Sequence, residues 1–285
     1  MASSDHGILV GYDGSSSSHQ ALSWAAREAR ARGVALTLCY TWAPGSAGPP
    51  LAGEPEDLAR ESAERILATG MRSVFAPDVR QLLVEGPAAR MLCEHSDAAD
   101  MVVVGSRGLG GLSGLMLGSV SLQVAGYAAG PVVVVRGHWR PVGEYLPGPI
   151  VVGADGSAAT EGALAFGGAE AALRGVPLMV VCALSDTAGS VGMAHRIEED
   201  VERSIILWEK AHPGVDVHRQ ITIESPRTAL LTAAQDAQLL VVGCRGRGGV
   251  KDMPLGSVTQ ALLWHATCPL AVIHAHKPPG WLQGR

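Results

Sequence analysis

The chain contains 285 residues, carries a formal net charge of −5 at pH 7, and is 47% hydrophobic. Because a typical domain has about 150 residues, this length predicts about two domains, each large enough for its own core. The negative charge offers no basic face for nucleic acid, so we expect no nucleic-acid partner.

The cysteines are spread along the chain without a Cys-x-x-Cys pair, so neither a disulfide framework nor a zinc site is indicated. They are Cys39, Cys93, Cys182, Cys244 and Cys268. The first residues lack the basic stretch and the apolar run that mark a signal peptide. We therefore expect a cytoplasmic protein.

In the first half, short runs rich in Val, Leu and Ile alternate with helical patterns, as is typical of strands buried on both faces of a sheet. The strands are expected near 8–12, 34–41, 79–84, 101–105 and 131–136. The helices are expected near 17–32, 56–70, 87–97 and 119–129. This alternation predicts an α/β fold: a parallel sheet with right-handed crossovers and helices on both faces.

Residues 108–135 contain no charged side chain, so this segment has to be tested as a membrane span. Its glycines and Pro131 would break a spanning helix, and the equivalent segment of the second half carries Arg247, Lys251 and Asp252. We therefore expect no membrane association.

The two halves of the chain repeat each other. The segment ILVGYDGS at 8–15 recurs as IVVGADGS at 150–157, and a glycine-rich segment at 102–124 recurs at 241–262. The chain is therefore a tandem duplication. A linker rich in Pro and Gly is expected between two domains. The first domain spans 1–136, the linker 137–148, the second domain 149–276 and a tail 277–285.

The glycine-rich loop predicts a phosphate site. Asp13 follows the first strand and Gly105 closes the fourth, and open α/β sheets bind ligands beyond the carboxyl ends of their strands. Gly105 and Gly108 allow positive φ and a close approach of the backbone. Gly118-Ser119 opens the next helix, whose free N–H groups favour an anion, and the Ser119 hydroxyl can donate to a phosphate oxygen.

Simpler roles for these residues stay open. Asp13 and Asp155 can end a strand and begin an Asx turn, and Ser119 and Ser257 can be plain helix N-caps. The arginine in each loop can be a solvated charge: Arg107 and Arg245.

The spacing Gly-x2-Gly-x9-Gly-Ser, downstream of a strand-ending Asp in VG-x-DGS, resembles the ATP-binding signature of the universal stress protein family. It occurs at Gly105, Gly108, Gly118 and Ser119, and again at Gly243, Gly246, Gly256 and Ser257. The resemblance covers nearly the whole chain and is similar to the tandem form found in actinobacteria. It implies two Rossmann-like domains of the adenine nucleotide alpha hydrolase-like kind, each a five-stranded parallel sheet of order 3-2-1-4-5.

The resemblance also implies roles for single residues. Asp13 and Asp155 would contact the ribose or the adenine end, and Gly11 and Gly153 would let the nucleotide approach the strand end. Adenine would lie against the ends of the second strands, at Thr41 and Ala183. The two glycine motifs would wrap the triphosphate, together with their neighbours Arg107, Ser121, Arg245 and Thr259.

Signatures of enzymes built on similar sheets are absent from the sequence. The chain has no G-x-x-x-x-G-K-[ST] loop, no G-x-S-x-G elbow and no G-x-G-x-x-G after the first strand, and no general base is evident. The histidines show no spacing typical of metal ligands, so surface or helix-end positions are expected for His265, His274 and His276.

We therefore expect a non-enzymatic, ATP-binding regulator or sensor of the stress response with one ATP site per domain, with or without Mg²⁺. Two alternatives stay open. The first is a slow ATPase or nucleotidyl-transfer enzyme, and the second is an interaction scaffold with degenerate sites.

The fifth strand of each half leaves an edge that invites pairing, which predicts that the halves pack as an intramolecular dimer. A homodimer and an unknown protein partner stay open. The second loop differs from the uncharged first loop, 109–117, by Arg247, Lys251, Asp252 and Pro254. Its added cations predict a second site of slightly higher affinity and greater salt sensitivity.

Overall fold

The computed structural model of the protein describes residues 5–42, 56–109, 117–136, 148–184, 191–247 and 253–274. These residues form two compact units, one ending at Arg136 and one formed by the described residues from 148 onward. The predicted tail at 277–285 and most of the predicted linker lie outside the described residues.

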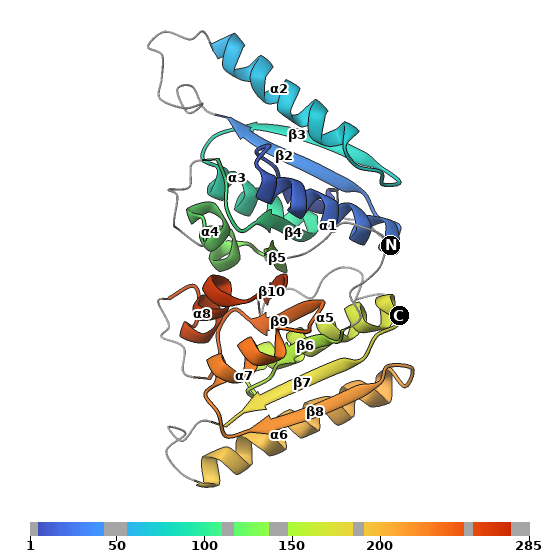
Figure 1. Ribbon diagram of the computed structural model, residues 1–285, viewed down its shortest axis with the longest axis vertical. Helices are drawn as coiled ribbons and strands as arrows, with labels where there is room; N and C mark the ends of the chain where they lie inside the picture. Colours follow the sequence, from blue (N-terminus) through green and yellow to red (C-terminus); the bar gives the residue numbers. More distant parts are fainter. Residues whose placement is uncertain are drawn as a thin grey trace. The chain divides into compact units, whose positions relative to one another are not determined.

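In the first unit, strands and helices alternate along the chain (Figure 1). The elements are β1 (Gly7–Gly11), α1 (Ser16–Arg32), β2 (Leu36–Trp42), α2 (Glu56–Arg72), β3 (Val79–Glu85), α3 (Ala88–His95), the 3-10 turn η1 (Ser96–Ala98), β4 (Ala99–Gly105), α4 (Ser119–Tyr127) and β5 (Val132–Val135). Each strand and helix predicted from the first half is present, with its ends within two residues of the prediction.

The second unit repeats this order. Its elements are β6 (Ile150–Gly153), α5 (Ala158–Arg174), β7 (Leu178–Ala183), α6 (Val191–Ala211), β8 (Val217–Thr222), α7 (Pro226–Ala233), β9 (Leu239–Gly243), α8 (Ser257–His265) and β10 (Leu270–Ile273).

Within the first unit the strand order is β3-β2-β1-β4-β5, and all neighbouring strands run parallel. Within the second unit the order is β8-β7-β6-β9-β10, again with parallel neighbours. The expected order 3-2-1-4-5 is thus confirmed in each half. The winding reverses between β1 and β4, and between β6 and β9, so the carboxyl ends of these two pairs are the ligand-binding positions of such sheets.

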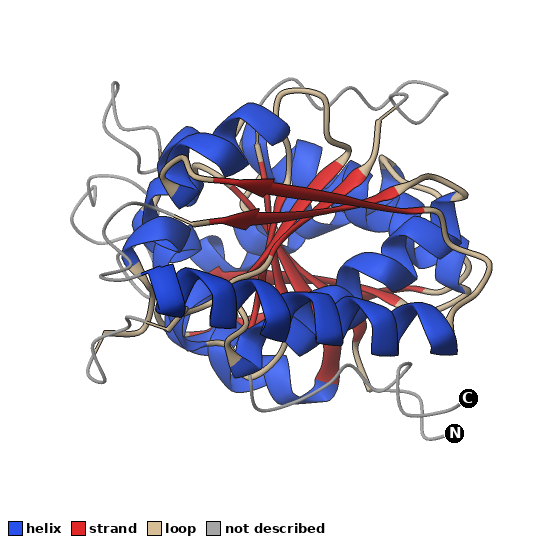
Figure 2. Cartoon of the chain, turned by 90° about the horizontal axis from the view of Figure 1, so that it is seen from below, coloured by secondary structure: helices blue, strands red, loops and turns tan. Residues whose placement is uncertain are grey.

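Helices cover both faces of the strands (Figure 2). Because successive crossovers are right-handed, the helices before and after the reversal lie on opposite faces. In the first unit α3 packs against α4, while α1 packs against β1 and β4. The central strands are therefore buried on both sides: Ile8, Leu9 and Val10 of β1 have no exposed surface.

In the second unit α6 lies close against α5. A Cβ atom built on Gly168 of α5 would stand only 1.9 Å from Cζ2 of Trp208 on α6, so only glycine fits there. Trp208 in turn stacks on His212, with ring centroids 4.3 Å apart. This packing holds α6 against α5.

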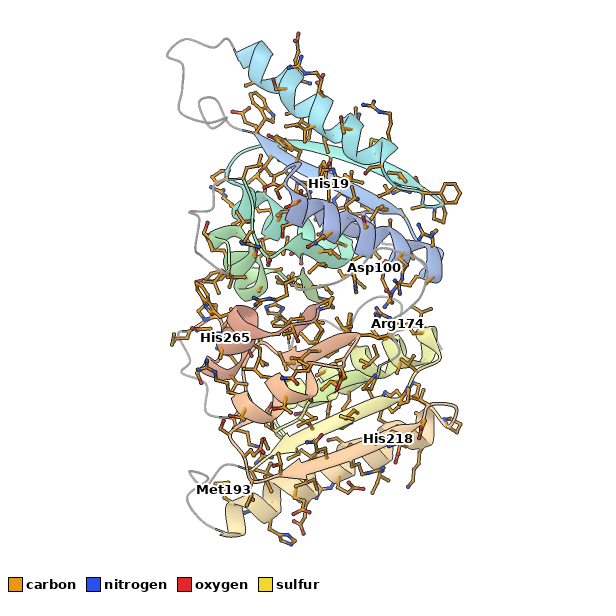
Figure 3. All side chains as sticks on the ribbon, in the orientation of Figure 1. His19, Asp100, Arg174, Met193, His218 and His265 are labelled. Atoms are coloured by element: carbon orange, nitrogen blue, oxygen red, sulfur yellow. The ribbon has the colours of Figure 1, made fainter. Side chains whose placement is uncertain are left out.

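His265 is the last residue of α8 and its side chain is exposed (Figure 3), as expected for a helix-end histidine. None of the described helices has the length and low charge needed to cross a bilayer.

Candidate functional site

The first candidate site lies where β1 and β4 end side by side. Gly11 of β1 pairs with Val104 of β4, so Asp13 emerges beside the start of the glycine loop. The Asp13 carboxylate accepts a hydrogen bond from the backbone N–H of Leu109 at 3.0 Å and another from the N–H of Ser15 at 2.9 Å. The structure therefore brings together the aspartate and the loop that the sequence placed 96 positions apart.

The second site repeats these contacts between β6 and β9. The Asp155 carboxylate accepts from the backbone N–H of Arg247 at 2.9 Å and from the N–H of Ser157 at 3.0 Å. The Thr160 hydroxyl also donates to it, at 3.2 Å. Each aspartate thus starts a local Asx turn and also anchors its loop, so the turn role and the site role coincide in one residue.

Burial and hydrogen bonding act in opposite directions on Asp13. Burial alone would raise the pKa of its carboxyl, but hydrogen bonds from Ser15, Ser18 and the N–H of Leu109 hold that pKa below its ordinary value. Asp13 therefore carries its negative charge at neutral pH, and a ligand near it must offer hydrogen-bond donors, such as hydroxyl groups.

Gly105 and Gly108 do not adopt the positive φ that glycine allows. Neither residue is among the glycines with positive φ in the described part of the chain, whereas Gly14 and Gly156, which follow the two aspartates, have φ values of 81° and 67°. The left-handed conformation thus belongs to the Asp-Gly turns, where the chain reverses from strand to helix.

The first two glycines of each motif are required because other atoms of the protein occupy the place of a Cβ atom. A Cβ atom on Gly105 would stand 2.6 Å from backbone and side-chain atoms of Ser17, and one on Gly108 would stand 2.6 Å from the Asp13 carboxylate. The same holds for Gly243 against Ala159 at 2.5 Å and for Gly246 against Asp155 at 2.3 Å. These four glycines set the loop against the strand ends.

The last glycine of each motif is less crowded than the other two. A Cβ atom on Gly118 would meet no heavy atom closer than 3.5 Å, and the nearest atom to one on Gly256 is also at 3.5 Å. Both residues have ordinary extended backbone angles, with φ of −81° and −71°. A methyl group therefore fits at these two positions in ordinary van der Waals contact.

The serines after these glycines do not cap their helices, which overturns the N-cap alternative. Gly118 is the N-cap of α4 and Gly256 is the N-cap of α8, and neither helix has a side-chain capping hydrogen bond. Ser119 and Ser257 are the first helical residues, and both are exposed. Two helix N-termini thus present backbone N–H groups and a serine hydroxyl toward the loops, an arrangement suited to an anion.

Ser121 and Thr259 make hydrogen bonds within the fold, and Thr259 also lines the cavity of the second unit. The Ser121 hydroxyl donates to the carbonyl of Gly105 at 2.6 Å, and the Thr259 hydroxyl donates to the carbonyl of Gly243 at 2.9 Å. Both side chains are buried. Their donated hydrogen bonds tie each helix to the end of the adjacent strand.

A cavity of about 500 Å³ opens at the second site. Asp155 and Thr160 lie on its wall together with the apolar side chains of Val181, Ala183 and Leu230. The glycine loop and the start of α8 complete the lining with Gly243, Arg245, Gly246, Arg247, Gly256 and Ser257. Its volume suits a small organic ligand with one apolar end and one anionic end.

The other predicted residues fall at or near the strand ends. Gly11 packs against other side chains, because its Cβ would stand 2.9 Å from Leu92. Gly153 and Ala183 line the cavity of the second unit. Thr41 lies near the end of β2 and is partly exposed. The loop arginines are both exposed: Arg107 and Arg245.

Sequence reasoning missed one part of the second site. The Arg247 guanidinium forms an ion pair with Asp200 of α6 and donates to the carbonyl of Gly156 at 2.8 Å. The sequence marks Arg247 only as an added cation of the second loop. No sequence pattern links it to Asp200, which lies 47 positions away. Lys251 and Asp252 of the same loop lie outside the described residues.

Comparisons with known proteins agree with this architecture. The model of the universal stress protein family matches residues 6–136 and 148–274. A universal stress protein of Mycolicibacterium smegmatis is 36% identical over 290 residues, covering 96% of this chain and 98% of that protein. The universal stress protein Rv2005c of Mycobacterium tuberculosis is 33% identical over 284 residues. That match covers 94% of this chain and 96% of the mycobacterial protein.

A crystal structure of a universal stress protein from Archaeoglobus fulgidus shares the fold, with a TM-score of 0.70 at 20% identity. That likeness covers 96% of this chain and 100% of the archaeal chain. Because the family model matches both halves, the chain belongs to the universal stress protein family as a tandem member.

Proposed function

We propose that the chain binds ATP, with one site in each half, and acts as a nucleotide-dependent regulator or sensor of the stress response. The observation that carries this proposal is the cavity of about 500 Å³ between Asp155, the glycine loop and the start of α8. Its three walls differ in chemistry, and each suits one part of a nucleoside triphosphate.

The apolar wall of Val181, Ala183 and Leu230 suits a flat base, because burying apolar surface is the main source of its binding energy. The Asp155 carboxylate has acceptor capacity beyond the three hydrogen bonds that it receives, so it can accept from a ribose hydroxyl.

The third wall suits phosphate. It combines the uncapped N-terminus of α8, the exposed Ser257 hydroxyl and two arginines, Arg245 and Arg247. Gly256 has no side chain that could cover the backbone N–H groups at this end of the helix, so a phosphate group can approach them. The first half repeats the aspartate contact at Asp13, and α4 also begins at a glycine N-cap, Gly118, without a side-chain capping hydrogen bond.

We further propose that the output of binding is conformational rather than catalytic. Among the described residues that line the cavity, Asp155 is the only carboxylate and none is a histidine. Asp155 accepts hydrogen bonds from Ser157, Thr160 and Arg247, so in this proposal it anchors the loop and the ribose rather than activating a water molecule. Steady product formation from ATP that stops in the Ser119→Ala/Ser257→Ala variant would instead favour the slow ATPase.

Ligand identity can be tested in two steps. Nucleotide released from freshly purified protein is first identified by mass spectrometry, with adenosine phosphates expected. Thermal unfolding is then followed with ATP, AMP and adenosine. Saturation near 100 times the dissociation constant adds about 2.7 kcal/mol per site, a shift of several degrees, so ATP should raise Tm most. Equal shifts with ATP and adenosine would contradict the phosphate site.

A further inference from the structure

The second site contains a link between its loop and a neighbouring helix. The Arg247 backbone N–H donates to Asp155 at 2.9 Å, while its guanidinium donates to the Gly156 carbonyl at 2.8 Å and pairs with Asp200. One side chain therefore joins the glycine loop, the turn after β6 and helix α6. Met193 in Figure 3 marks the beginning of that helix.

This ion pair is accessible to solvent. The side chains of Arg247 and Asp200 are 32% and 40% exposed, so water and a ligand can both reach them. Ion pairs of such exposure are weak and can exchange partners at little cost. Asp200 also has a second partner, since its other carboxylate oxygen lies 3.5 Å from the guanidinium of Arg203. Asp200 would thus keep a counter-charge if Arg247 left it.

Arg247 also lines the cavity, on the same loop as Arg245. A guanidinium offers five N–H donors and binds phosphate oxygens through paired hydrogen bonds. A polyphosphate presents more charge and more acceptors than one carboxylate, so it competes with Asp200 for this side chain.

We propose that Arg247 signals occupancy of the second site: without ligand it holds α6 through Asp200, and a bound polyphosphate draws it away and releases α6. This inference rests on the proposed function, because the competing ligand is the triphosphate of the nucleotide. It deepens that function by naming the element that responds.

The described residues of the first half differ at both ends of this link. Gly14 faces Ile66 of α2, whereas the equivalent Gly156 faces Asp200 of α6. Leu109 occupies the position equivalent to Arg247, and its backbone N–H makes the same contact with Asp13, at 3.0 Å. Its apolar side chain cannot pair with an acid or a phosphate. The two sites therefore share a backbone framework but differ in their coupling to the neighbouring helix.

A double-mutant cycle in the full chain tests the proposal. The background is Gly118→Val, which places a branched side chain at the N-cap of α4, should obstruct phosphate at the first site and leaves the second site to be measured alone. Affinities for ATP and adenosine are measured by calorimetry for Arg247→Leu, Asp200→Asn and the double variant. Asp200→Asn should tighten ATP binding by about two- to fivefold, and Arg247→Leu should weaken it by a similar factor.

The interaction between the two changes is decisive. Combined with Arg247→Leu, the Asp200→Asn change should have no further effect on ATP, because its influence passes through Arg247. Adenosine affinity should stay unchanged throughout. The matched control is Arg203→Gln, which removes a cation from the same aspartate without touching the loop, and ATP affinity should stay within about twofold.

Hydrogen exchange provides a second measurement. In the free protein, Arg247→Leu should speed amide exchange in α6 near Asp200, and saturating ATP should do the same in the Gly118→Val background. If Asp200→Asn shifts ATP affinity equally with and without Arg247, or if ATP slows exchange in α6, the inference is wrong while the ATP site stands. If neither the wild type nor the Gly118→Val variant binds ATP, the proposed function itself fails.

Discussion

The carboxylate of Asp13 accepts a hydrogen bond from the backbone N–H of Leu109 at 3.0 Å, which ties the end of β1 to the glycine loop after β4. The loop packs so closely there that a Cβ on Gly108 would stand 2.6 Å from the same carboxylate. One contact thus explains both the aspartate and the glycine of the motif.

Changing Asp13 should make the first unit less stable at neutral pH. Because the folded-state pKa of Asp13 lies below its ordinary value, the ionised carboxylate contributes stability above the unfolded pKa, and this stability is lost as pH falls through the folded pKa. Asp13→Asn should therefore lower Tm at neutral pH by a few degrees, and the difference from wild type should shrink below about pH 5.

Circular dichroism at several pH values measures this effect, with the exposed Asp78→Asn as the control. A Tm difference for Asp13→Asn that stays constant down to acid pH would show that the charge of Asp13 does not stabilise the fold.

The glycines of one motif should divide into two classes. Gly108→Ala should destabilise the first unit by about 1–3 kcal/mol, since its Cβ would meet the Asp13 carboxylate at 2.6 Å. Gly118→Ala should leave Tm nearly unchanged, since the nearest atom to its Cβ is at 3.5 Å. Urea unfolding of both variants separates the classes, and equal losses of stability would refute the division.

A histidine pair should make the first unit sensitive to mild acid. His6 Nε2 lies 3.3 Å from His95 Nδ1. Burial, followed by the neighbouring His95, holds the pKa of His6 below 6.5, and Arg80 adds to this while Asp5 opposes it. The depressed pKa means that stability is complete above the unfolded pKa and declines as pH falls through the folded pKa.

Tm should thus fall between about pH 7 and pH 5, and His6→Gln should flatten this decline. The exposed His218, which pairs with Asp216, provides the control His218→Gln. A decline of the same size in His6→Gln would contradict the role of this pair.

The sequence was sufficient to predict the strands and helices, because hydrophobic patterns are local. The meeting of Asp13 with the glycine loop followed from the rule that open α/β sheets bind ligands beyond the carboxyl ends of their strands. The sequence was insufficient for the backbone angles. The positive φ values lie at Gly14 and Gly156, whereas Gly105 and Gly108 must be glycines because neighbouring atoms leave no room for a Cβ atom. Such crowding depends on neighbours from distant segments, which no local pattern records.

The capping role of Ser119 and the pairing of Arg247 with Asp200 were also beyond the sequence. The sequence Gly-Ser before a helix is compatible with serine as the N-cap or as the first helical residue. In the structure Ser119 is the first helical residue and Gly118 is the N-cap. Arg247 and Asp200 meet only because α6 packs beside the loop. The packing of one half on the other through the fifth strands stays a prediction.

Calorimetric titration with ATP tests the central claim most directly, because it counts sites. We expect two sites in the wild type, one in Gly118→Val, one in Gly256→Val and none in the double variant, since a valine side chain at the start of either helix should obstruct the approach of phosphate to the backbone. The second site should be slightly tighter and more sensitive to salt. Two sites that persist in the double variant would contradict binding at the glycine loops, and a single wild-type site that survives one of the substitutions would show that the corresponding loop binds no nucleotide.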